Sequence, residues 1–354
     1  MNTISNLTKE AIALLQSLIQ TPSLSRQEDT TATILKNYLE KYCTNVKRLK
    51  NNIWVKNKHF DDNKPSILLN SHHDTVPANK GYTRNSLDGV IESEKLFGLG
   101  SNDAGGALVS LLATFLHFYS KEDLAYNLIF AATAEEEISG TDGMELLYAQ
   151  LPDIDVAIIG EPTQMQMAVA EKGLLVIDCT VLGKAGHAAR EEGENAIYKA
   201  LKDIEWFKNF KFGKVSELLG PVKMSVTILN AGIQHNMFPE VCTFTVDIRI
   251  NELYTHEEIL KIISHNTSSK VVPRSTRIKS TSIAISYPLV QSGISLGLKM
   301  YGSPTTSDKA LITCPSLKIG PGDSARSHTA DEFIYIKEIE EGIKIYIKLF
   351  ENIL

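Results

Sequence analysis

Paired cysteines are missing from this chain of 354 residues. Its four cysteines, Cys43, Cys179, Cys242 and Cys314, lie far apart and form no C-x-x-C motif. This spacing argues against a disulfide framework and predicts a reduced, cytoplasmic protein. In such a protein cysteines serve as small apolar core residues.

Long apolar runs and an excess of basic residues are also missing. No segment reaches roughly 18 consecutive apolar residues, so no transmembrane helix is expected. The first residues lack the basic start and the cleavage site of a signal peptide, and Ile12, Leu15 and Ile19 mark one face of an amphipathic helix instead. The net charge of −6 argues against nucleic-acid binding, which requires a basic surface. Neither a membrane nor a nucleic acid is therefore expected as a partner.

The length of the chain and its pattern of apolar residues predict two domains with different kinds of strand. In the first half, apolar strand-like stretches at 65–72, 126–134 and 156–162 alternate with helical segments such as 104–120. Apolar runs without clean alternation are typical of a mostly parallel sheet that helices cover on both faces. The first half therefore predicts an α/β catalytic domain.

From about Gly173 the strands alternate between apolar and polar residues. The expected order is strand, helix, strand, strand, helix, strand, which is that of a ferredoxin-like α+β domain. The four strands are placed at 174–183, 222–232, 241–251 and 277–286, and the two helices at 193–210 and 255–266. We expect a catalytic domain of residues 1–173 and 283–354, interrupted by a lid and dimerisation domain of residues 174–282.

Three consecutive glutamates follow the predicted strand 126–134, in the stretch FAATAEEEISG. Neighbouring carboxylates repel one another, and burial of an unpaired charge costs several kcal/mol. A solvated acidic loop is one explanation for Glu135, Glu136 and Glu137. Coordination of a cation is the other, because a metal ion turns the repulsion into binding.

Other polar residues follow predicted strands or glycine-rich turns. In SHHDTVP, His72 and Asp74 share one face of an extended segment, as at metal sites where an acid orients a histidine. GLGSNDAGG resembles a phosphate-binding turn, but Asp103 stands where the dinucleotide fingerprint has its third glycine, so capping or metal ligation suits it better. Glu161 in GEPT and His328 in SHTADEF are weak signals when taken alone.

Together, these residues predict a metal site. Most of them follow strands, and sites of open α/β sheets form at the carboxyl ends of strands. Oxygen and nitrogen ligands without thiolates suit Zn²⁺, Mn²⁺ or Co²⁺. Two ions that share one carboxylate would lie roughly 3.5–4 Å apart, an arrangement used for hydrolysis.

Five stretches, SHHDTVP, GLGSNDAGG, TAEEEISG, GEPT and SHTADEF, resemble in order and spacing the motifs of the M20 family of di-zinc amidohydrolases. The resemblance extends over essentially the whole chain. It implies two divalent ions, with Zn²⁺ preferred and Co²⁺ or Mn²⁺ as alternatives. It further implies that His72 binds one ion and that Asp103 bridges both. Glu137 and His328 would complete the shell of one ion, and Glu161 that of the other.

The resemblance also implies roles for residues that bind no metal. Glu136 would be the general base, Asp74 would orient His72, and Glu135 would be a supporting or surface residue. Two departures from the family pattern stand out: Ser71 replaces a common glycine, and Gly105 replaces the lysine of a D-x-K-G motif. Neither departure removes a ligand.

Outside the motifs, the resemblance implies a homodimer in which His187 of GKAGHAAR reaches the neighbouring subunit's site and stabilises the oxyanion. A substrate carboxylate needs a cationic or multi-donor clamp. The resemblance implies that Asn236, Arg249 and Thr306 supply this clamp.

The motifs look most like those of acetylornithine deacetylases and succinyl-diaminopimelate desuccinylases. The expected activity is hydrolysis of an N-acyl-L-amino acid, N-acetyl-L-ornithine first, with N-acetylcitrulline and N-succinylornithine as close relatives in arginine biosynthesis. Succinyl-diaminopimelate desuccinylase and an M20 carboxypeptidase or dipeptidase are the alternatives of the same class. A metal-free binding protein of this shape and a dinucleotide oxidoreductase are the alternatives from other classes.

Overall fold

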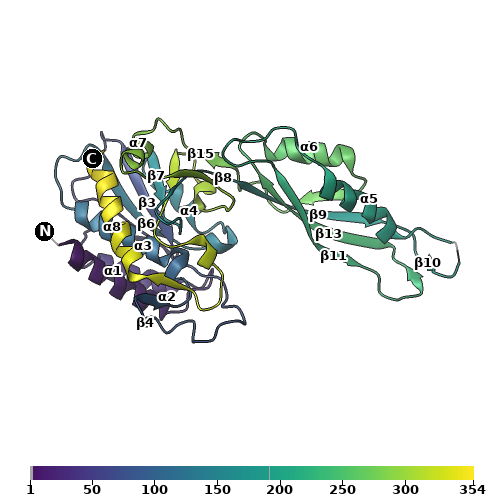
Figure 1. The fold of residues 1–354 in the computed structure, drawn as a ribbon, viewed down its shortest axis with the longest axis horizontal. Helices are drawn as coiled ribbons and strands as arrows, with labels where there is room; N and C mark the ends of the chain where they lie inside the picture. The colour runs from purple at the N-terminus through teal and green to yellow at the C-terminus, as the bar shows by residue number, and fades with distance from the viewer. Residues whose placement is uncertain (1–2, 191) are drawn as a thin grey trace. The chain divides into compact units, whose positions relative to one another are not determined.

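The structure, a computed structural model, describes residues 3–190 and 192–354 and divides into two compact units (Figure 1). The first unit comprises Met1–Val169, Ser282–Tyr301 and Ser307–Leu354. The second comprises Ala170–Thr281 and Gly302–Thr306. The short segment Gly302–Thr306 thus belongs to the second unit, whereas it was expected in the catalytic domain.

The first unit is built on a nine-stranded sheet of order β1-β2-β6-β3-β7-β17-β8-β15, with β16 paired to β8. Its four central strands β6, β3, β7 and β17 run parallel to one another, which confirms the predicted mostly parallel sheet, while β2 and β8 pair antiparallel with β6 and β17 on either side. The strands are β1 (Lys47–Leu49), β2 (Asn52–Lys56), β3 (Ser66–His72), β6 (Asn127–Thr133), β7 (Val156–Ile159), β8 (Met167–Glu171), β15 (Thr281–Ser282), β16 (Met300–Ser303) and β17 (Ser316–Lys318).

Helices cover both faces of this sheet, and strand residues face them alternately. Ile67 and Leu69 of β3 belong to the large core under α1, α3 and α8, while Leu68 belongs to a smaller core with Met144 and Leu147 of α4. This double burial explains why the strands are apolar throughout. The helices are α1 (Ile4–Ile19), α2 (Asp29–Leu39), α3 (Gly106–Phe118), α4 (Met144–Tyr148), α7 (Pro288–Ser295) and α8 (Ile336–Glu351).

A small antiparallel sheet of order β18-β5-β4 also lies in the first unit. It consists of β4 (Ile91–Glu92), β5 (Lys95–Phe97) and β18 (Phe333–Tyr335). This sheet joins the segment before Asp103 to the segment after His328. The two segments are remote in sequence, and the pairing brings them together.

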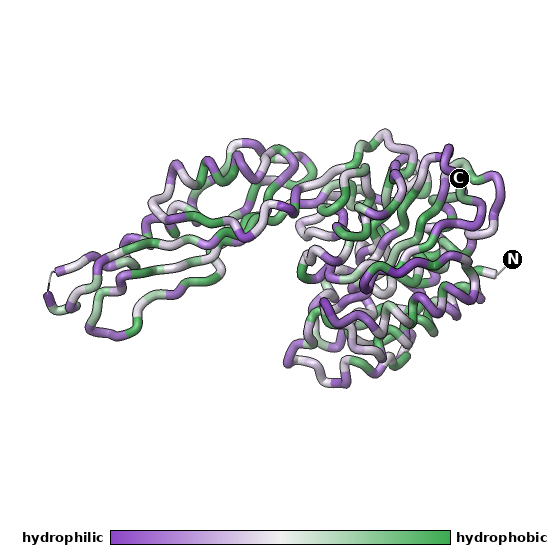
Figure 2. The backbone as a smooth tube through the Cα atoms, turned by 180° about the vertical axis from the view of Figure 1, so that it is seen from behind, coloured by the Kyte–Doolittle hydropathy of each residue, from purple (hydrophilic) through white to green (hydrophobic). Residues whose placement is uncertain are grey.

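The second unit has a four-stranded antiparallel sheet of order β11-β13-β9-β14. Its chain order is β9 (Gly173–Leu182), α5 (Ala196–Asn209), β11 (Lys223–Ala231), β13 (Val241–Ile250), α6 (His256–Asn266) and β14 (Lys270–Pro273), and a two-stranded sheet of β10 (Gly186–His187) and β12 (Met237–Phe238) is added. This is the predicted ferredoxin-like arrangement. Figure 2 shows hydrophobic stretches along the strands of both units and hydrophilic residues in many of the loops.

One strand prediction is wrong. The fourth strand of the second unit is β14 (Lys270–Pro273), which pairs with β9, and not the stretch 277–286. Within that stretch only Thr281–Ser282 is a strand, β15, and it extends the sheet of the first unit. The alternation in RIKSTSIAIS resembles a strand locally, but pairing partners decide where a strand forms, and KVVP occupies the edge beside β9.

Two further predictions concern composition. All four cysteines are free thiols, and three of them are buried. Among the residues that the structure describes, no helix is both long and apolar enough to cross a membrane.

Candidate metal centre and catalytic site

Polar side chains gather at the carboxyl ends of the parallel strands of the first unit. His72 is the last residue of β3, and Glu136 and Glu137 begin the turn after β6. Glu161 follows β7, and Asp103 lies in the turn that leads into α3. Parallel strands end at the same sheet edge, so residues remote in sequence meet there.

The imidazole of His72 is the centre of this cluster, and it is only 1% exposed. Its Nδ1 lies 3.1 Å from the backbone oxygen of Asp74. Its buried Nε2 has no hydrogen-bond partner. Instead it faces oxygens of three carboxylates: Asp103 at 3.4 Å, Glu136 at 3.9 Å and Glu161 at 4.0 Å. A buried imidazole nitrogen without a hydrogen-bond partner and the carboxylates around it together form a set of ligands that suits a divalent cation.

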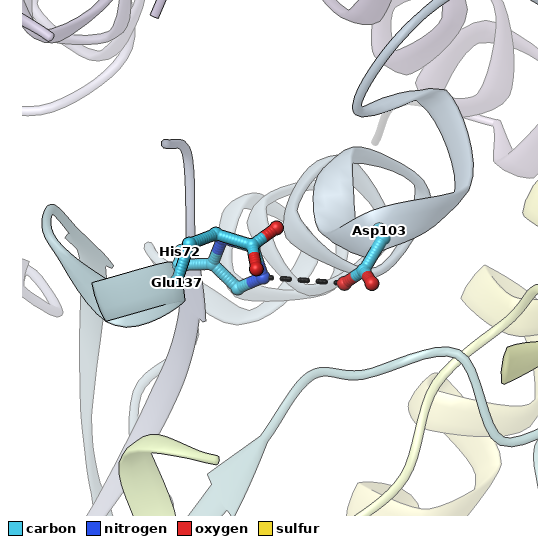
Figure 3. Close-up of side chains that lie close together, drawn as sticks. All are labelled: His72, Asp103 and Glu137. Atoms are coloured by element: carbon cyan, nitrogen blue, oxygen red, sulfur yellow. Dashed lines mark ion pairs between the residues drawn. The ribbon is translucent and has the colours of Figure 1, made fainter. Parts of the chain in front are cut away.

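Two overlapping groups of potential ligands share His72. In one group, ligand atoms of His72, Asp103 and Glu137 lie within 4.8 Å of one another, and in the other those of His72, Glu136 and Glu161 do. Figure 3 shows the first group, with Asp103 at the start of the helix facing the imidazole and Glu137 beside it. His328 adds a second imidazole, whose Nε2 lies 2.9 Å from Glu137 Oε2 and 3.7 Å from Asp103 Oδ2.

Asp74 connects the histidine to the glutamate turn. Its Oδ1 lies 3.4 Å from His72 Nδ1 and accepts a hydrogen bond from the backbone N–H of Glu136 at 3.0 Å. Its Oδ2 accepts from the backbone N–H of Glu137 at 3.2 Å and from the Ser25 hydroxyl at 2.7 Å. One buried carboxylate therefore holds both the imidazole ring and the backbone of the two glutamates.

Burial and the neighbouring negative charges raise the pKa values of two glutamates in the cluster. Burial raises the pKa of Glu136 well above its ordinary value, and the charges of Glu161, Asp308 and Glu137 add to the shift. Burial likewise raises the pKa of Glu161 to about 8 against the opposing charges of Lys318 and His72. A divalent cation that binds these carboxylates would displace their protons into solvent and would neutralise their negative charge. The residues therefore fit a divalent metal site.

Asp103 and the two histidines shift in the ways that ion pairing predicts. Burial lowers the pKa of His72, but the carboxylates of Asp103 and Asp74, each 3.4 Å from the ring, outweigh this effect and raise the pKa well above its ordinary value. The hydrogen bond to Glu137 raises the pKa of His328 to about 9. In Asp103, burial raises the pKa, yet the nearby His72 imidazole outweighs burial and the net shift of the pKa is downward.

The neighbours of these residues in the motifs have other partners. Glu135 has a left-handed backbone, with φ of 57°, and its carboxylate lies 3.8 Å from Arg26. The ring of His73 is bound by the Thr31 hydroxyl and the backbone oxygen of Asn51, each at 2.9 Å. Only two of the three consecutive glutamates therefore join the cluster.

Gly105, which stands where the resemblance expects lysine, lies where no side chain fits. A Cβ there would be 2.4 Å from the backbone oxygen of Gly100 and 2.5 Å from Leu15 Cδ1. Contacts below 3.0 Å essentially never occur for a real Cβ, so the close backbone of Gly100, together with Leu15 of α1, accounts for the glycine.

Two buried carboxylates near the cluster were missed in the sequence. Asp308 Oδ2 accepts hydrogen bonds from Thr133 Oγ1 at 2.7 Å and Asn70 Nδ2 at 3.1 Å, and burial raises the pKa of Asp308 to about 6. Burial also raises the pKa of Glu332 to about 7, against three backbone N–H donors. Each lies close in sequence to a residue that the sequence does predict for the site. Asp308 follows the predicted substrate-binding residue Thr306, and Glu332 follows the predicted metal ligand His328.

Four of the expected site residues lie in the second unit. His187 is exposed on β10, and its Nδ1 accepts from the backbone N–H of Ala189 at 3.1 Å. Asn236 is exposed in the turn before β12, and its backbone oxygen accepts from Ala188 N–H at 2.9 Å, so this turn lies beside His187. Thr306 is half-buried in the segment Gly302–Thr306.

Arg249 lies apart from this pair. It is the penultimate residue of β13 (Val241–Ile250), whereas Asn236 precedes that strand. Its Nε and Nη2 bind the two carboxylate oxygens of Asp247 at 2.8 and 3.0 Å. A substrate carboxylate at Arg249 would have to use Nη1 or displace Asp247.

The sequence matches a family model and several known proteins. The family model described as peptidase family M20/M25/M40 matches residues 68–352. A succinyl-diaminopimelate desuccinylase of Orientia tsutsugamushi is 28% identical over 73% of this chain and 71% of its own length. An acetylornithine deacetylase of Buchnera aphidicola is 26% identical over 96% of this chain and 97% of its own length.

The fold is shared with solved structures. An M20 family metallo-carboxypeptidase of Sulfolobus solfataricus aligns with a TM-score of 0.77 at 17% identity, over 98% of this chain and 100% of that one. At this identity the likeness concerns the fold alone.

Proposed function

Because this chain belongs to peptidase family M20/M25/M40, and is thus a metal-dependent hydrolase, we propose that it cleaves the amide bond of an N-acyl-L-amino acid. N-acetyl-L-ornithine is the first candidate, with N-acetylcitrulline and N-succinylornithine as close alternatives in arginine biosynthesis. The observation that carries the proposal is the buried, unpartnered Nε2 of His72 amid three carboxylates.

The proposed ligands divide between two divalent ions. His72 and Glu161 would hold one divalent ion, Glu137 and His328 the other, and Asp103 both, since its two oxygens face the two imidazoles. When bound, Zn²⁺ (or Co²⁺ or Mn²⁺) would lower the pKa of an attacking water and polarise the amide carbonyl.

Glu136 is the proposed general base and acid. Its carboxylate lies 3.9 Å from His72 Nε2, whereas that of Glu137 lies 2.9 Å from His328 Nε2. A raised pKa suits a group that must take a proton from water and then give it to the leaving amine. Asp74 would serve both partners, because it orients the His72 ring and fixes the backbone of Glu136.

The names of two relatives support the proposed substrate class. One relative that matches nearly the whole chain is named an acetylornithine deacetylase, and another relative is named a succinyl-diaminopimelate desuccinylase. The desuccinylase is therefore the alternative, with a carboxypeptidase third. The clamp of Asn236, Arg249 and Thr306 for the substrate carboxylate stays a prediction, as does the cytoplasmic location.

A substrate panel tests the proposed activity. Purified enzyme with added Zn²⁺ would be assayed on acetyl and succinyl derivatives of ornithine, citrulline, lysine and diaminopimelate, and on an N-blocked dipeptide. We expect the highest kcat/KM for an N-acetyl derivative of ornithine or citrulline. A preference for succinyl-diaminopimelate would move the chain to the alternative, and a preference for the dipeptide would make it a peptidase.

We also propose a homodimer formed through the second unit. Strand β11 is at the edge of its sheet, and apolar residues on it and on the neighbouring α5 are exposed: Ile228 by 48%, Leu229 by 53% and Tyr198 by 69%. An unprotected edge with apolar side chains favours pairing with another strand, and two copies could pair isologously. His187 would then act in the neighbouring subunit's site.

Mixed dimers test this shared site. Homodimers of His187→Ala and of Glu136→Ala are each expected to be nearly inactive. When the two are unfolded together and refolded in equal amounts, half of the dimers should be mixed. One site of each mixed dimer combines an intact Glu136 with an intact partner His187, so about a quarter of the parental activity should return. If heterodimers form without activity, His187 does not act across the subunit boundary.

A further inference from the structure

The turn that carries Asp103 presents three backbone N–H groups to a single side chain. Glu332 Oε1 accepts from the N–H of Asn102 at 2.8 Å and of Asp103 at 2.9 Å. Its Oε2 accepts from the N–H of Gly100 at 3.2 Å. The carboxylate thus occupies a concave arrangement of amide donors of the kind that binds anions.

Further bonds between the same two segments are reciprocal. The side chain of Asn102 donates from Nδ2 to the backbone oxygen of Asp323 at 3.0 Å and accepts at Oδ1 from Asp323 N–H at 2.9 Å. The N–H of Gly98 donates to the backbone oxygen of Glu332 at 2.9 Å. Hydrogen bonds therefore join residues 98–103 to residues 323–332, the segment that contains His328.

The surroundings of Glu332 make this carboxylate unusual. It is 1% exposed, and its two oxygens accept from the backbone N–H groups of Gly100, Asn102 and Asp103. Removal of a buried acceptor leaves its donors unsatisfied, which is more costly than the bonds themselves are worth. The turn before α3 consequently depends on Glu332 for its backbone conformation.

The conformation of that turn decides where the two oxygens of Asp103 lie. Oδ1 is 3.4 Å from His72 Nε2, and Oδ2 is 3.7 Å from His328 Nε2. We propose that Glu332 is a positioning residue for the metal centre, holding Asp103 where one oxygen faces each imidazole. This inference rests on the proposed metal centre and adds to it a residue that touches neither ion.

The test compares two variants of Glu332 with a matched control. Glu332→Gln keeps the shape but places an amide nitrogen against one of the donors, and Glu332→Ala removes the acceptor. Asp203→Asn is the control, because Asp203 is a buried carboxylate of the second unit that likewise accepts from backbone N–H groups, those of Ser268 and Ser269. The readouts are Zn²⁺ affinity by competition with a chromophoric chelator, kcat and KM, and the unfolding temperature of the metal-free protein.

We expect Zn²⁺ affinity to fall about 10-fold in Glu332→Gln and about 100-fold in Glu332→Ala, the range known for residues that support metal ligands. KM should stay within about 3-fold, since no substrate contact changes. Asp203→Asn should lower the unfolding temperature and leave Zn²⁺ affinity at the parental value. The isosteric Glu332→Gln carries the test if Glu332→Ala does not fold.

Parental Zn²⁺ affinity in a folded Glu332 variant would overturn the inference, even if its unfolding temperature falls as in the control, because Glu332 would then only stabilise the turn. A parent protein that takes up no Zn²⁺ would overturn the metal centre itself, and the inference with it. The two failures are therefore distinguishable in one experiment.

Discussion

Glutamine in place of Glu136 is expected to lower kcat about 10²–10⁴-fold, the range for loss of a general acid–base group. The amide keeps the size and the polar contacts of the side chain but cannot take a proton from water. Since Glu136 is not among the proposed ligands, bound metal should remain at the parental level. Steady-state kinetics and elemental analysis of the purified variant measure both quantities.

The neighbouring glutamates supply the controls. Glu137→Gln should lower metal content as well as kcat, because it changes a proposed ligand that also binds His328. Glu135→Gln should leave both near the parental value, because Glu135 lies against Arg26 outside the cluster. If Glu136→Gln loses metal while Glu137→Gln keeps it, the roles of the two glutamates must be exchanged.

Removal of the metal is expected to abolish hydrolysis completely, and Zn²⁺, Co²⁺ or Mn²⁺ should restore it. The five proposed ligands include three carboxylates packed around two imidazoles, and a divalent cation would turn the repulsion between these carboxylates into coordination. Activity would be followed through chelation, dialysis and readdition of each ion, with Mg²⁺ as an oxygen-preferring comparison. Full activity in protein shown by elemental analysis to be metal-free would exclude the mechanism.

Uptake of the ion should also depend on pH in a defined direction. In the metal-free protein Glu161, with a pKa of about 8, and His328, with a pKa of about 9, hold protons below these values. Both must release the proton to bind a cation, so Zn²⁺ affinity should rise as pH rises towards about 9 and binding should release protons. Calorimetry in buffers of different ionisation enthalpy measures the number released. Uptake without proton release would contradict the raised pKa values.

Much of the fold could be predicted because its signals are local. The apolar runs at residues 65–72 and 126–134 indicate strands buried on both faces, and the structure places both in the centre of the parallel sheet. The β-α-β-β-α-β order of the second unit was correct for the same reason. The last strand was misplaced because RIKSTSIAIS and KVVP both suit a strand, and only the vacant edge beside β9 selects KVVP.

The sequence by itself determined the family and the kinds of ligand, because five motifs keep their order and each carries its ligating side chain within a few residues. Only the tertiary structure decided how these side chains meet: Asp74 connects His72 to the glutamate turn, Glu135 lies apart, and Leu15 fills the space beside Gly105. The same holds for Glu332, whose carboxylate binds the backbone of Asp103 across 229 residues of chain. The physical reason is that a local pattern records what a residue can bind, whereas packing of distant segments decides what is within reach.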